Sequence, residues 1–371
     1  MNPAVLAYFA DDPTRTYQLV PWLPVLEVLD QEQPVAIVLR DPASAEIVRE
    51  RTQLPVLVAP EFTALTELYA ALDAKIVLYC NNSILNFQSL LHAGTLHVHI
   101  NHGESDKHSM ASNNAKAYDR VFVAGEAAVQ RYVAELLELD TSKLVRIGRP
   151  QLDLSPPPLL EPSDRRTVLY APTWEGDAEY NDYTSVDTLG VEIVRGLLSL
   201  PGVRVVYKPH PKVTTSRTPA IRDAHRAILA LVDAAGPEHR VITSGDILAV
   251  LPACDAMVTD VSSVGLDWLY LRTECPIFIT DRHHDTERLR REVPVSRCAD
   301  VLDGVDAAGV AALVAARLAH DEHRLARVAM RRHYFDDVAV GESTTRFLEE
   351  VGVLVALRDR LVGVPGAAAT A

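Results

Sequence analysis

The sequence predicts an α/β protein built from two doubly wound, Rossmann-like domains. The chain has 371 residues, 48% of them hydrophobic, which is enough for two cores and long for a single domain. Short β-branched runs alternate with longer helical patterns, as in a parallel sheet covered by helices on both faces. A proline-rich segment interrupts this alternation once, and the pattern then starts again.

Ten short runs rich in β-branched residues are predicted strands, five in each half of the chain. Ligands of doubly wound sheets bind beyond the carboxyl ends of the strands, so polar motifs that follow these runs are the candidates for function. The predicted strands are 35–39, 56–59, 76–79, 96–100 and 121–124 in the first half, and 168–171, 203–207, 241–243, 256–259 and 276–279 in the second.

The prolines of 154–162 mark the boundary between the domains, because proline continues neither a helix nor a central strand. We expect one Rossmann-like domain over 1–154, a linker over 155–163 and a second Rossmann-like domain over 164–345. Residues 346–371 are expected to form a helix that packs back across the hinge and ends in a frayed, Ala-rich tail. Two such domains would face each other across a cleft.

The formal net charge of −14 disfavours nucleic acid as a partner, because phosphate backbones are bound by clustered Lys and Arg side chains. Peripheral contact with a membrane surface would require a local basic patch. Four arginines that recur at helical spacing offer one, although a solvated helix face is the more common explanation. They are Arg324, Arg327, Arg331 and Arg332.

Neither a membrane span nor a signal peptide is predicted. No run of about 18 apolar residues occurs, and the first residues carry no basic segment. The four cysteines lie far apart without a CxxC pair, which indicates reduced thiols rather than disulfides or a cysteine zinc site. These features predict a cytoplasmic protein.

The most informative turn follows the predicted strand 256–259, where the chain reads Thr259-Asp-Val-Ser-Ser263 before a helical pattern begins. A helix N-terminus presents backbone N–H groups and the positive end of the helix dipole. Ser262 and Ser263 add hydroxyl donors, so the turn can bind the phosphates of a nucleotide diphosphate. Alternatively, Asp260, Ser262 or Ser263 caps the helix, which is the usual role of these residue types.

A candidate general base follows the predicted strand 96–100, at His102. Gly103 comes next and permits a sharp turn, and an imidazole with a near-neutral pKa can remove a proton from a hydroxyl. A hydrogen-bonded structural histidine is the alternative.

Histidines around this strand also raise the question of a metal. His97 and His99 share one face of the strand, and His102 and His108 follow. Because His97 and His99 alternate with apolar residues, they can equally pack under a helix, and a third ligand is not specified. We expect no metal site.

In the second half, the strand 203–207 runs into Lys208-Pro-His-Pro-Lys212. Two prolines fix His210 in an extended turn, and the flanking lysines make the turn electropositive, which suits a developing phosphate charge. A rigid surface turn is the alternative.

Three further residues are candidates for contact with a nucleotide diphosphate. Thr173 follows the strand 168–171 and can donate to a phosphate, and Trp174 can stack on a base or belong to the core. Arg149, between Gly148 and Pro150, offers a guanidinium for a diphosphate or is a solvated residue of the hinge turn.

Five motifs in this order resemble the CDP-glycerol glycerophosphotransferase family, which contains teichoic acid primases and polymerases. The resemblance covers about residues 95–350, including Asp337-x3-Gly341-x-Ser343 before the last helix. The five motifs are His102-Gly-x3-Lys107, Gly148-x-Pro150 with Asp153, Ala171-Pro-Thr-Trp174, Lys208-Pro-His-Pro211 and Thr259-Asp-x-Ser-Ser263.

The resemblance implies a GT-B fold and transfer of a polyol phosphate from a CDP-activated donor, such as CDP-glycerol or CDP-ribitol, to a hydroxyl of a lipid-linked acceptor, with release of CMP. It implies that His102 is the general base and that His210 stabilises the phosphate or the leaving group. Ser262 and Ser263 would bind the donor diphosphate, Asp260 would orient their turn, and Lys208 or Arg149 would balance charge. No further cofactor is expected.

The sequence also departs from the family pattern. Glu104-Ser-Asp106 stands where polymerases have an apolar and basic segment, which leaves the acceptor open. Two other functions therefore stay in view. One is a GT-B glycosyltransferase or epimerase that uses a UDP-sugar, and the other is a noncatalytic GT-B module that binds nucleotide or partner proteins.

Overall fold

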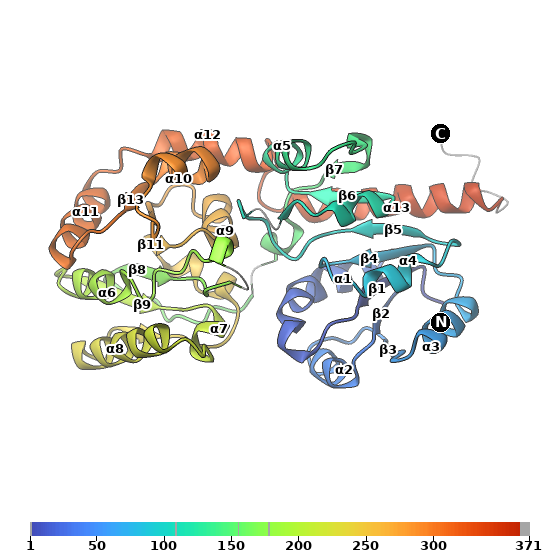
Figure 1. Ribbon diagram of the computed structural model, residues 1–371, viewed down its shortest axis with the longest axis horizontal. Helices are drawn as coiled ribbons and strands as arrows, with labels where there is room; N and C mark the ends of the chain where they lie inside the picture. The colour runs from blue at the N-terminus through green and yellow to red at the C-terminus, as the bar shows by residue number, and fades with distance from the viewer. Residues whose placement is uncertain (1, 108–109, 155, 177–178, 364–371) are drawn as a thin grey trace. The chain divides into compact units, whose positions relative to one another are not determined.

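The computed structural model describes residues 2–107, 110–154, 156–176 and 179–363, and the chain divides into two compact units (Figure 1). Unit 1 comprises Met1–Glu104, Ala111–Leu154 and Phe335–Ala371, and unit 2 comprises Ser105–Met110 and Ser155–Tyr334. Unit 1 is interrupted after Leu154, and it takes in the residues from Phe335 onward. The domain bounds at 154 and 345 stay predictions.

Unit 1 is a parallel sheet of seven strands in the order β3-β2-β1-β4-β5-β6-β7. The strand order reverses between β1 and β4, because the chain builds the sheet outward from β1 on one side and from β4 on the other. Doubly wound sheets open a crevice for ligands at this switch point. Its strands are β1 (Val5–Phe9), β2 (Val35–Leu39), β3 (Val56–Val58), β4 (Ile76–Tyr79), β5 (Leu96–His99), β6 (Arg120–Val123) and β7 (Leu144–Arg146).

Alternate residues of these strands face two separate cores, as the period of a β-strand requires. One core takes in side chains of α1, α2 and α13, and the other takes in side chains of α3 and α5. The helices of unit 1 are α1 (Leu23–Asp30), α2 (Pro42–Arg49), α3 (Phe62–Ala71), α4 (Asn86–Leu90), α5 (Glu126–Glu135) and α13 (Glu342–Leu361), with 3₁₀ turns η1 (Pro13–Gln18), η2 (Val20–Trp22), η4 (Asn113–Ala117), η5 (Thr141–Lys143) and η6 (Pro150–Leu152).

Unit 2 is a parallel sheet of six strands in the order β10-β9-β8-β11-β12-β13, with its switch point between β8 and β11. The side chains of α6, α8 and α11 pack with one face of this sheet. Its strands are β8 (Arg166–Ala171), β9 (Val203–Tyr207), β10 (Arg240–Val241), β11 (Ala256–Thr259), β12 (Ile277–Thr280) and β13 (Asp300–Leu302).

The helices of unit 2 complete the alternation of strand and helix. They are α6 (Gly190–Leu198), α7 (Pro211–Thr214), α8 (Pro219–Ala235), α9 (Ser263–Leu271), α10 (Thr286–Glu292), α11 (Ala307–Ala319) and α12 (Arg324–Phe335), with 3₁₀ turns η7 (Glu179–Asn181), η8 (Ile247–Ala249), η9 (Leu251–Ala253) and η10 (Pro294–Cys298). All ten predicted strands are present, with ends shifted by two residues at most, and β1, β7 and β13 were not predicted.

The last helix is joined to the turn that follows β7 by contacts within unit 1. The Asp153 carboxylate accepts from the backbone N–H groups of Gly341 (2.7 Å) and Thr344 (2.6 Å), so a side chain about 190 residues away caps α13. The Ser343 hydroxyl accepts from the backbone N–H of Arg149 at 3.0 Å. Hydrogen bonds therefore connect the Gly148-x-Pro150 motif and its Asp153 with the Gly341-x-Ser343 segment.

The four arginines at helical spacing do not form a shared solvated face. Arg327 is 1% exposed, contacts Asp321 and donates to the Thr273 carbonyl at 2.9 Å. Arg331 lies 4.6 Å from the centroid of the Tyr270 ring. The expectation of a solvated face was wrong for Arg327, because its charge is satisfied inside unit 2.

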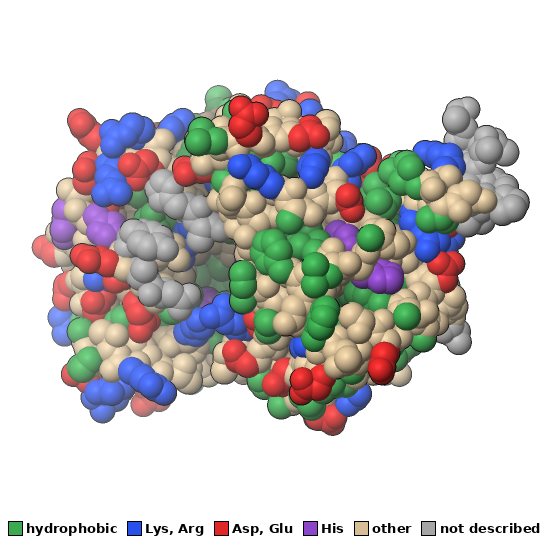
Figure 2. All heavy atoms as spheres, turned by 45° about the vertical axis from the view of Figure 1, so that its right-hand side comes forward, with side chains coloured by type: hydrophobic (Ala, Val, Ile, Leu, Met, Phe, Trp, Pro, Cys, Tyr) green, Lys and Arg blue, Asp and Glu red, His purple; other side chains and the backbone are tan. Residues whose placement is uncertain are grey.

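On the face drawn in Figure 2, Lys and Arg side chains are interspersed with Asp and Glu side chains. In the part of the chain that the structure describes, no helix is both long enough and apolar enough to cross a membrane.

Replacement by alanine should destabilise the protein at Gly148 and stabilise it at Gly352. Gly148 has φ +78°, and a Cβ there would lie 2.1 Å from the Ser343 hydroxyl oxygen, whereas a Cβ on Gly352 in α13 would meet nothing within 4 Å. Gly148→Ala should lower the free energy of unfolding by about 2 kcal/mol or more. Gly352→Ala should raise it by about 0.5–1 kcal/mol. Urea denaturation measures both, and equal effects of the two variants would contradict this account of Gly148.

Candidate active site

The candidate residues lie at the carboxyl ends of central strands in each unit. In unit 1, His102 follows β5 and contacts the segments that follow β1 and β4. In unit 2, Thr173, His210 and Asp260 follow β8, β9 and β11. Both groups therefore surround the switch point of their own sheet, where the rule for doubly wound folds places ligands.

His102 is held neutral and in one orientation. Its pKa is lowered to about 4, because burial disfavours the charged ring and the Arg149 guanidinium repels it. A hydrogen bond with the Cys80 backbone raises the His102 pKa, because a ring N–H donates to the Cys80 carbonyl. Tyr17 contacts the ring edge-on at 6.3 Å between centroids. The second ring nitrogen of the neutral imidazole is therefore an acceptor.

Asn101 directly precedes His102, and no motif in the sequence pointed to it. Asn101 has φ +53°, a left-handed conformation that few residues other than glycine adopt. Its carbonyl accepts from the Trp22 indole N–H at 2.5 Å, and its side-chain oxygen lies 2.8 Å from His99 Nε2. Surrounding contacts thus hold a strained residue directly before the candidate base, as is common at functional sites.

The other histidines of β5 belong to the packing of unit 1. His97 lies 2.7 Å from the Tyr79 hydroxyl and 2.9 Å from the His92 carbonyl. The His99 ring stacks on Tyr118 at 5.0 Å. Within the described ranges, no three His, Cys, Asp or Glu side chains are arranged to hold a metal ion. His108 lies outside the described residues.

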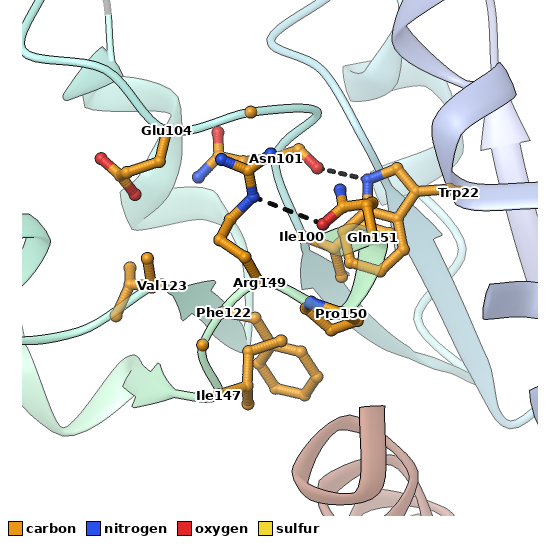
Figure 3. A pocket seen from close by; sticks show the side chains of 13 residues that line it. Trp22, Ile100, Asn101, Glu104, Phe122, Val123, Ile147, Arg149, Pro150 and Gln151 are labelled. Atoms are coloured by element: carbon orange, nitrogen blue, oxygen red, sulfur yellow. Dashed lines mark hydrogen bonds between the residues drawn. The ribbon is translucent and has the colours of Figure 1, made fainter. Parts of the chain in front are cut away.

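Arg149 enters a recess in unit 1 (Figure 3). The recess holds about 250 Å³ of empty space, counted together with the solvent at its mouth, and Asn101, Gly103 and Glu104 contribute to its wall. Arg149 is 8% exposed, and its Nε donates to the Gln151 side chain at 3.4 Å. Figure 3 shows Glu104 on the other side of the Arg149 side chain from Gln151.

Asp260 joins the ends of the central strands of unit 2. It is fully buried, and one carboxylate oxygen accepts from the backbone N–H groups of Thr173 (2.7 Å) and Ser185 (3.3 Å). The other oxygen accepts from the Thr280 hydroxyl at 2.6 Å. Asp260 therefore connects the segments that follow β8 and β11 with the last residue of β12, and no hydrogen bond from it to the start of α9 is found among the described residues.

Ser262 and Ser263 stand at the N-terminus of α9. Ser262 is the N-cap residue by its backbone conformation, but its side chain makes no capping hydrogen bond. Among the described residues, the Ser262 hydroxyl is buried without a hydrogen-bond partner. Capping by its side chain is thus not observed, and a donor remains next to the backbone N–H groups and dipole of the helix.

The hydrogen bond of the His210 ring makes its other nitrogen a donor, whereas that of the His102 ring makes its other nitrogen an acceptor. It is the N-cap of α7, and its Nδ1 accepts from the backbone N–H of Lys212 at 3.2 Å. The proton of the neutral ring is therefore on Nε2, which makes Nε2 a donor. The ring stacks with Trp174 at 6.1 Å, and the Lys212 ammonium lies 3.6 Å from the centroid of Trp174.

Lys208 and Thr173 support this turn from inside unit 2. The Lys208 ammonium donates to the carbonyls of Gly245 (2.9 Å) and Ser244 (3.4 Å), and burial lowers the Lys208 pKa. Thr173 is 5% exposed, and its carbonyl accepts from the Thr184 hydroxyl at 2.8 Å. Both residues hold loops around the turn that carries His210.

Asp260→Asn should change how stability depends on pH. Burial raises the Asp260 pKa to about 6, although hydrogen bonds from Ser185, Thr280 and Thr173 oppose the shift. Between about pH 4 and pH 6 the folded state thus holds a proton that the unfolded state releases, so the free energy of unfolding falls as the pH rises. The fall amounts to roughly 3 kcal/mol for a shift of about two units.

Asn lacks this titration and can still accept from the two backbone N–H groups. The stability of Asp260→Asn relative to the wild type should therefore increase from pH 4.5 to pH 7.5 in urea denaturation. Asp223→Asn, at an exposed position, is the control. Parallel pH profiles for wild type and Asp260→Asn would contradict the raised pKa.

Comparison with solved structures shows the fold. A putative UDP-N-acetylglucosamine 2-epimerase from Listeria monocytogenes matches with a TM-score of 0.65 at 15% identity, over 98% of this chain and 98% of that chain. A variant of the wall teichoic acid polymerase TagF soaked with CDPG matches with a TM-score of 0.60 at 12% identity, over 97% and 90%. An S. aureus MnaA–UDP structure matches with a TM-score of 0.58 at 12% identity, over 96% and 97%. The predicted GT-B fold is confirmed.

Comparison of sequences shows the family. No curated protein matches the chain. Residues 89–292, more than half of the chain, match the CDP-glycerol:poly(glycerophosphate) glycerophosphotransferase family, and this match includes the turns that carry His102, His210 and Ser262. The chain therefore belongs to the CDP-glycerol glycerophosphotransferase family, as the order of its motifs predicted.

Proposed function

We propose that this protein transfers a polyol phosphate from a CDP-activated donor to a hydroxyl group of an acceptor and releases CMP. The observation that carries the proposal is His102, a histidine held neutral and in one tautomer at the switch point of a sheet. A neutral imidazole with an available lone pair is the form that can accept a proton from a hydroxyl.

In the proposed reaction, unit 1 binds the acceptor. The second ring nitrogen of His102 takes the proton of the acceptor hydroxyl as its oxygen attacks the β-phosphorus of the donor. The bond between the β-phosphorus and the oxygen that bridges to the α-phosphorus breaks, and CMP leaves with that oxygen. Asn101 is a positioning residue, because its left-handed conformation directs His102.

Unit 2 binds the donor. The Ser262 hydroxyl, without a partner among the described side chains, and the neighbouring Ser263 would donate to the diphosphate at the N-terminus of α9. His210 Nε2 would donate to the phosphate oxygen on which charge develops as CMP leaves. Asp260, Thr173 and Lys208 hold the surrounding loops and position these donors.

The donor alcohol is proposed to be glycerol or ribitol, and the acceptor a lipid-linked or glycan chain in teichoic acid or capsule-type polymer synthesis. The family supports this assignment. We further propose that the reaction takes place in the cytoplasm, with peripheral contact at the inner face of the membrane. No metal or further cofactor takes part in the proposed chemistry.

Histidine replacements test the proposal. His102→Ala and His210→Ala should each lower kcat by about 10²–10⁴-fold, because one removes the base and the other a donor to the leaving phosphate. CMP release from CDP-glycerol in the presence of a polyol phosphate acceptor measures this. His320→Ala, at an exposed position after α11, should retain wild-type activity. The assignment fails if His102→Ala and His210→Ala both turn over like His320→Ala.

A second function is favoured by the structural neighbours, which include a putative UDP-N-acetylglucosamine 2-epimerase and a UDP-bound MnaA. Thermal unfolding with added nucleotides separates the two donor classes, since a ligand at 100 times its Kd stabilises the folded state by about 2.7 kcal/mol. CDP-glycerol, CDP-ribitol and CMP should raise Tm more than UDP or a UDP-sugar does. Greater stabilisation by UDP would favour the UDP-sugar enzyme, and binding of a CDP-alcohol without CMP release would favour a noncatalytic module.

A further inference from the structure

The phosphate site proposed for unit 2 has no positive charge among its assigned donors. These donors are the hydroxyls of Ser262 and Ser263 and the Nε2–H of His210. Both phosphate groups of a nucleoside diphosphate carry negative charge, and a charged donor binds such a group more strongly than a neutral donor does. A cation at the same end of the sheet is therefore expected.

Two cations on the loops at this end of the sheet are already engaged. The Lys208 ammonium donates to two backbone carbonyls inside unit 2, and Lys208 is 5% exposed. The Arg282 guanidinium pairs with Asp182 at 3.1 Å and with Asp187 at 3.2 Å, so carboxylates balance its charge. Neither side chain adds uncompensated positive charge next to His210.

Lys212 lies beside His210 and has no such partner. Its ammonium is 3.6 Å from the centroid of the Trp174 ring, and Trp174 stacks with His210 at 6.1 Å. In the part of the chain that the structure describes, no carboxylate pairs with Lys212. A lysine ammonium has three N–H groups, so its contact with an aromatic face leaves donors for an anion.

The loop that carries Lys212 is bonded to the loops that surround the N-terminus of α9. The backbone N–H of His210, after β9, donates to the Pro172 carbonyl, after β8, at 3.0 Å. The Asp260 carboxylate, after β11, accepts from the Thr173 backbone N–H at 2.7 Å. Because β8 lies between β9 and β11, the turn with Lys212 and the turn that leads into α9 flank the same loop at one end of the sheet.

We propose that Lys212 binds the diphosphate of the donor and that Trp174 positions its ammonium beside His210. The proposal rests on the proposed function and supplies the cation that its phosphate site lacks. It gives Lys212 the role of balancing charge, which the resemblance implied for Lys208 or Arg149. In the transfer, Lys212 would offset the negative charge that develops on the phosphate oxygen as CMP leaves.

Titration calorimetry of the full chain with CDP-glycerol and with cytidine tests the charge, since cytidine has the nucleoside without the phosphates. Lys212→Met should weaken CDP-glycerol binding about tenfold and leave cytidine binding within about twofold of the wild type. Lys212→Arg keeps the charge and should bind CDP-glycerol more tightly than Lys212→Met does. Arg222→Met, which removes an exposed cation of α8 in the same unit, is the control and should bind both ligands like the wild type.

Salt separates a charge from a structural role. Raising NaCl from about 50 to about 300 mM should weaken CDP-glycerol binding more in the wild type than in Lys212→Met, because salt screens the attraction between the ammonium and the phosphates. The same salt dependence in both proteins, an unchanged CDP-glycerol affinity in Lys212→Met, or an equal loss of cytidine binding would overturn the proposal.

Trp174 is tested through Lys212. Trp174→Leu should weaken CDP-glycerol binding in the wild-type background and have little further effect in the Lys212→Met background, because a positioning residue acts through the side chain that it positions. Trp174→Phe keeps an aromatic face and should restore most of the affinity; if Trp174→Leu does not fold, the weaker effect of Trp174→Phe is compared in the two backgrounds instead. Equal effects in both backgrounds would contradict the positioning role.

Kinetics distinguish failure of the proposal from failure of the proposed function. Lys212→Met should raise KM for CDP-glycerol about tenfold in the CMP release assay. If wild type and Lys212→Met release CMP with the same KM for CDP-glycerol, the proposed function stands and Lys212 does not bind the donor. If instead UDP binds more tightly than CDP-glycerol and CMP is never released, the proposed function fails, and weaker UDP binding by Lys212→Met still supports the phosphate site.

Discussion

Backbone groups at the carboxyl ends of the central strands lose their ladder partners, and buried side chains must satisfy them. In unit 2 the Asp260 carboxylate meets this constraint by accepting from Thr173 and Ser185, and it holds Thr280 as well. An ionised carboxylate without water is costly, which is why its pKa rises to about 6. If any one of these donors moved away, the buried charge of Asp260 would be less well satisfied. The turns around Asp260 are therefore held together.

Much of the fold follows from local pattern, since ten of the thirteen strands found in the described residues are short β-branched runs at the predicted places. The three that were missed have local reasons. β7 and β13 have three residues each and contain Arg146 and Asp300, and β1 lies at the start of the chain, before any helix sets the alternation. The contacts that hold the start of α13 could not be predicted, because Asp153 accepts from Gly341 and Thr344, which lie far from it in sequence.

The site divides in the same way. His102, His210 and Ser262 could be proposed as candidates from the sequence because each follows a predicted strand, and that rule depends only on local order. Asn101 could not, since its importance comes from a left-handed backbone and from contacts with Trp22 and His99. The direction of Arg149 was also hidden, because it is set by the turn at Gly148 and by a hydroxyl on α13.

The two histidines acquire opposite chemistry from their hydrogen bonds. One ring nitrogen of His102 donates to the Cys80 carbonyl, which leaves the other nitrogen as a proton acceptor. His210 accepts a backbone N–H at Nδ1, which places its proton on Nε2 as a donor. The proposed phosphoryl transfer needs a base at the attacking oxygen and a donor where charge develops, and these two local tautomers would supply one of each. Because main-chain groups set both tautomers, the acceptor nitrogen of His102 and the donor nitrogen of His210 are present at the same pH.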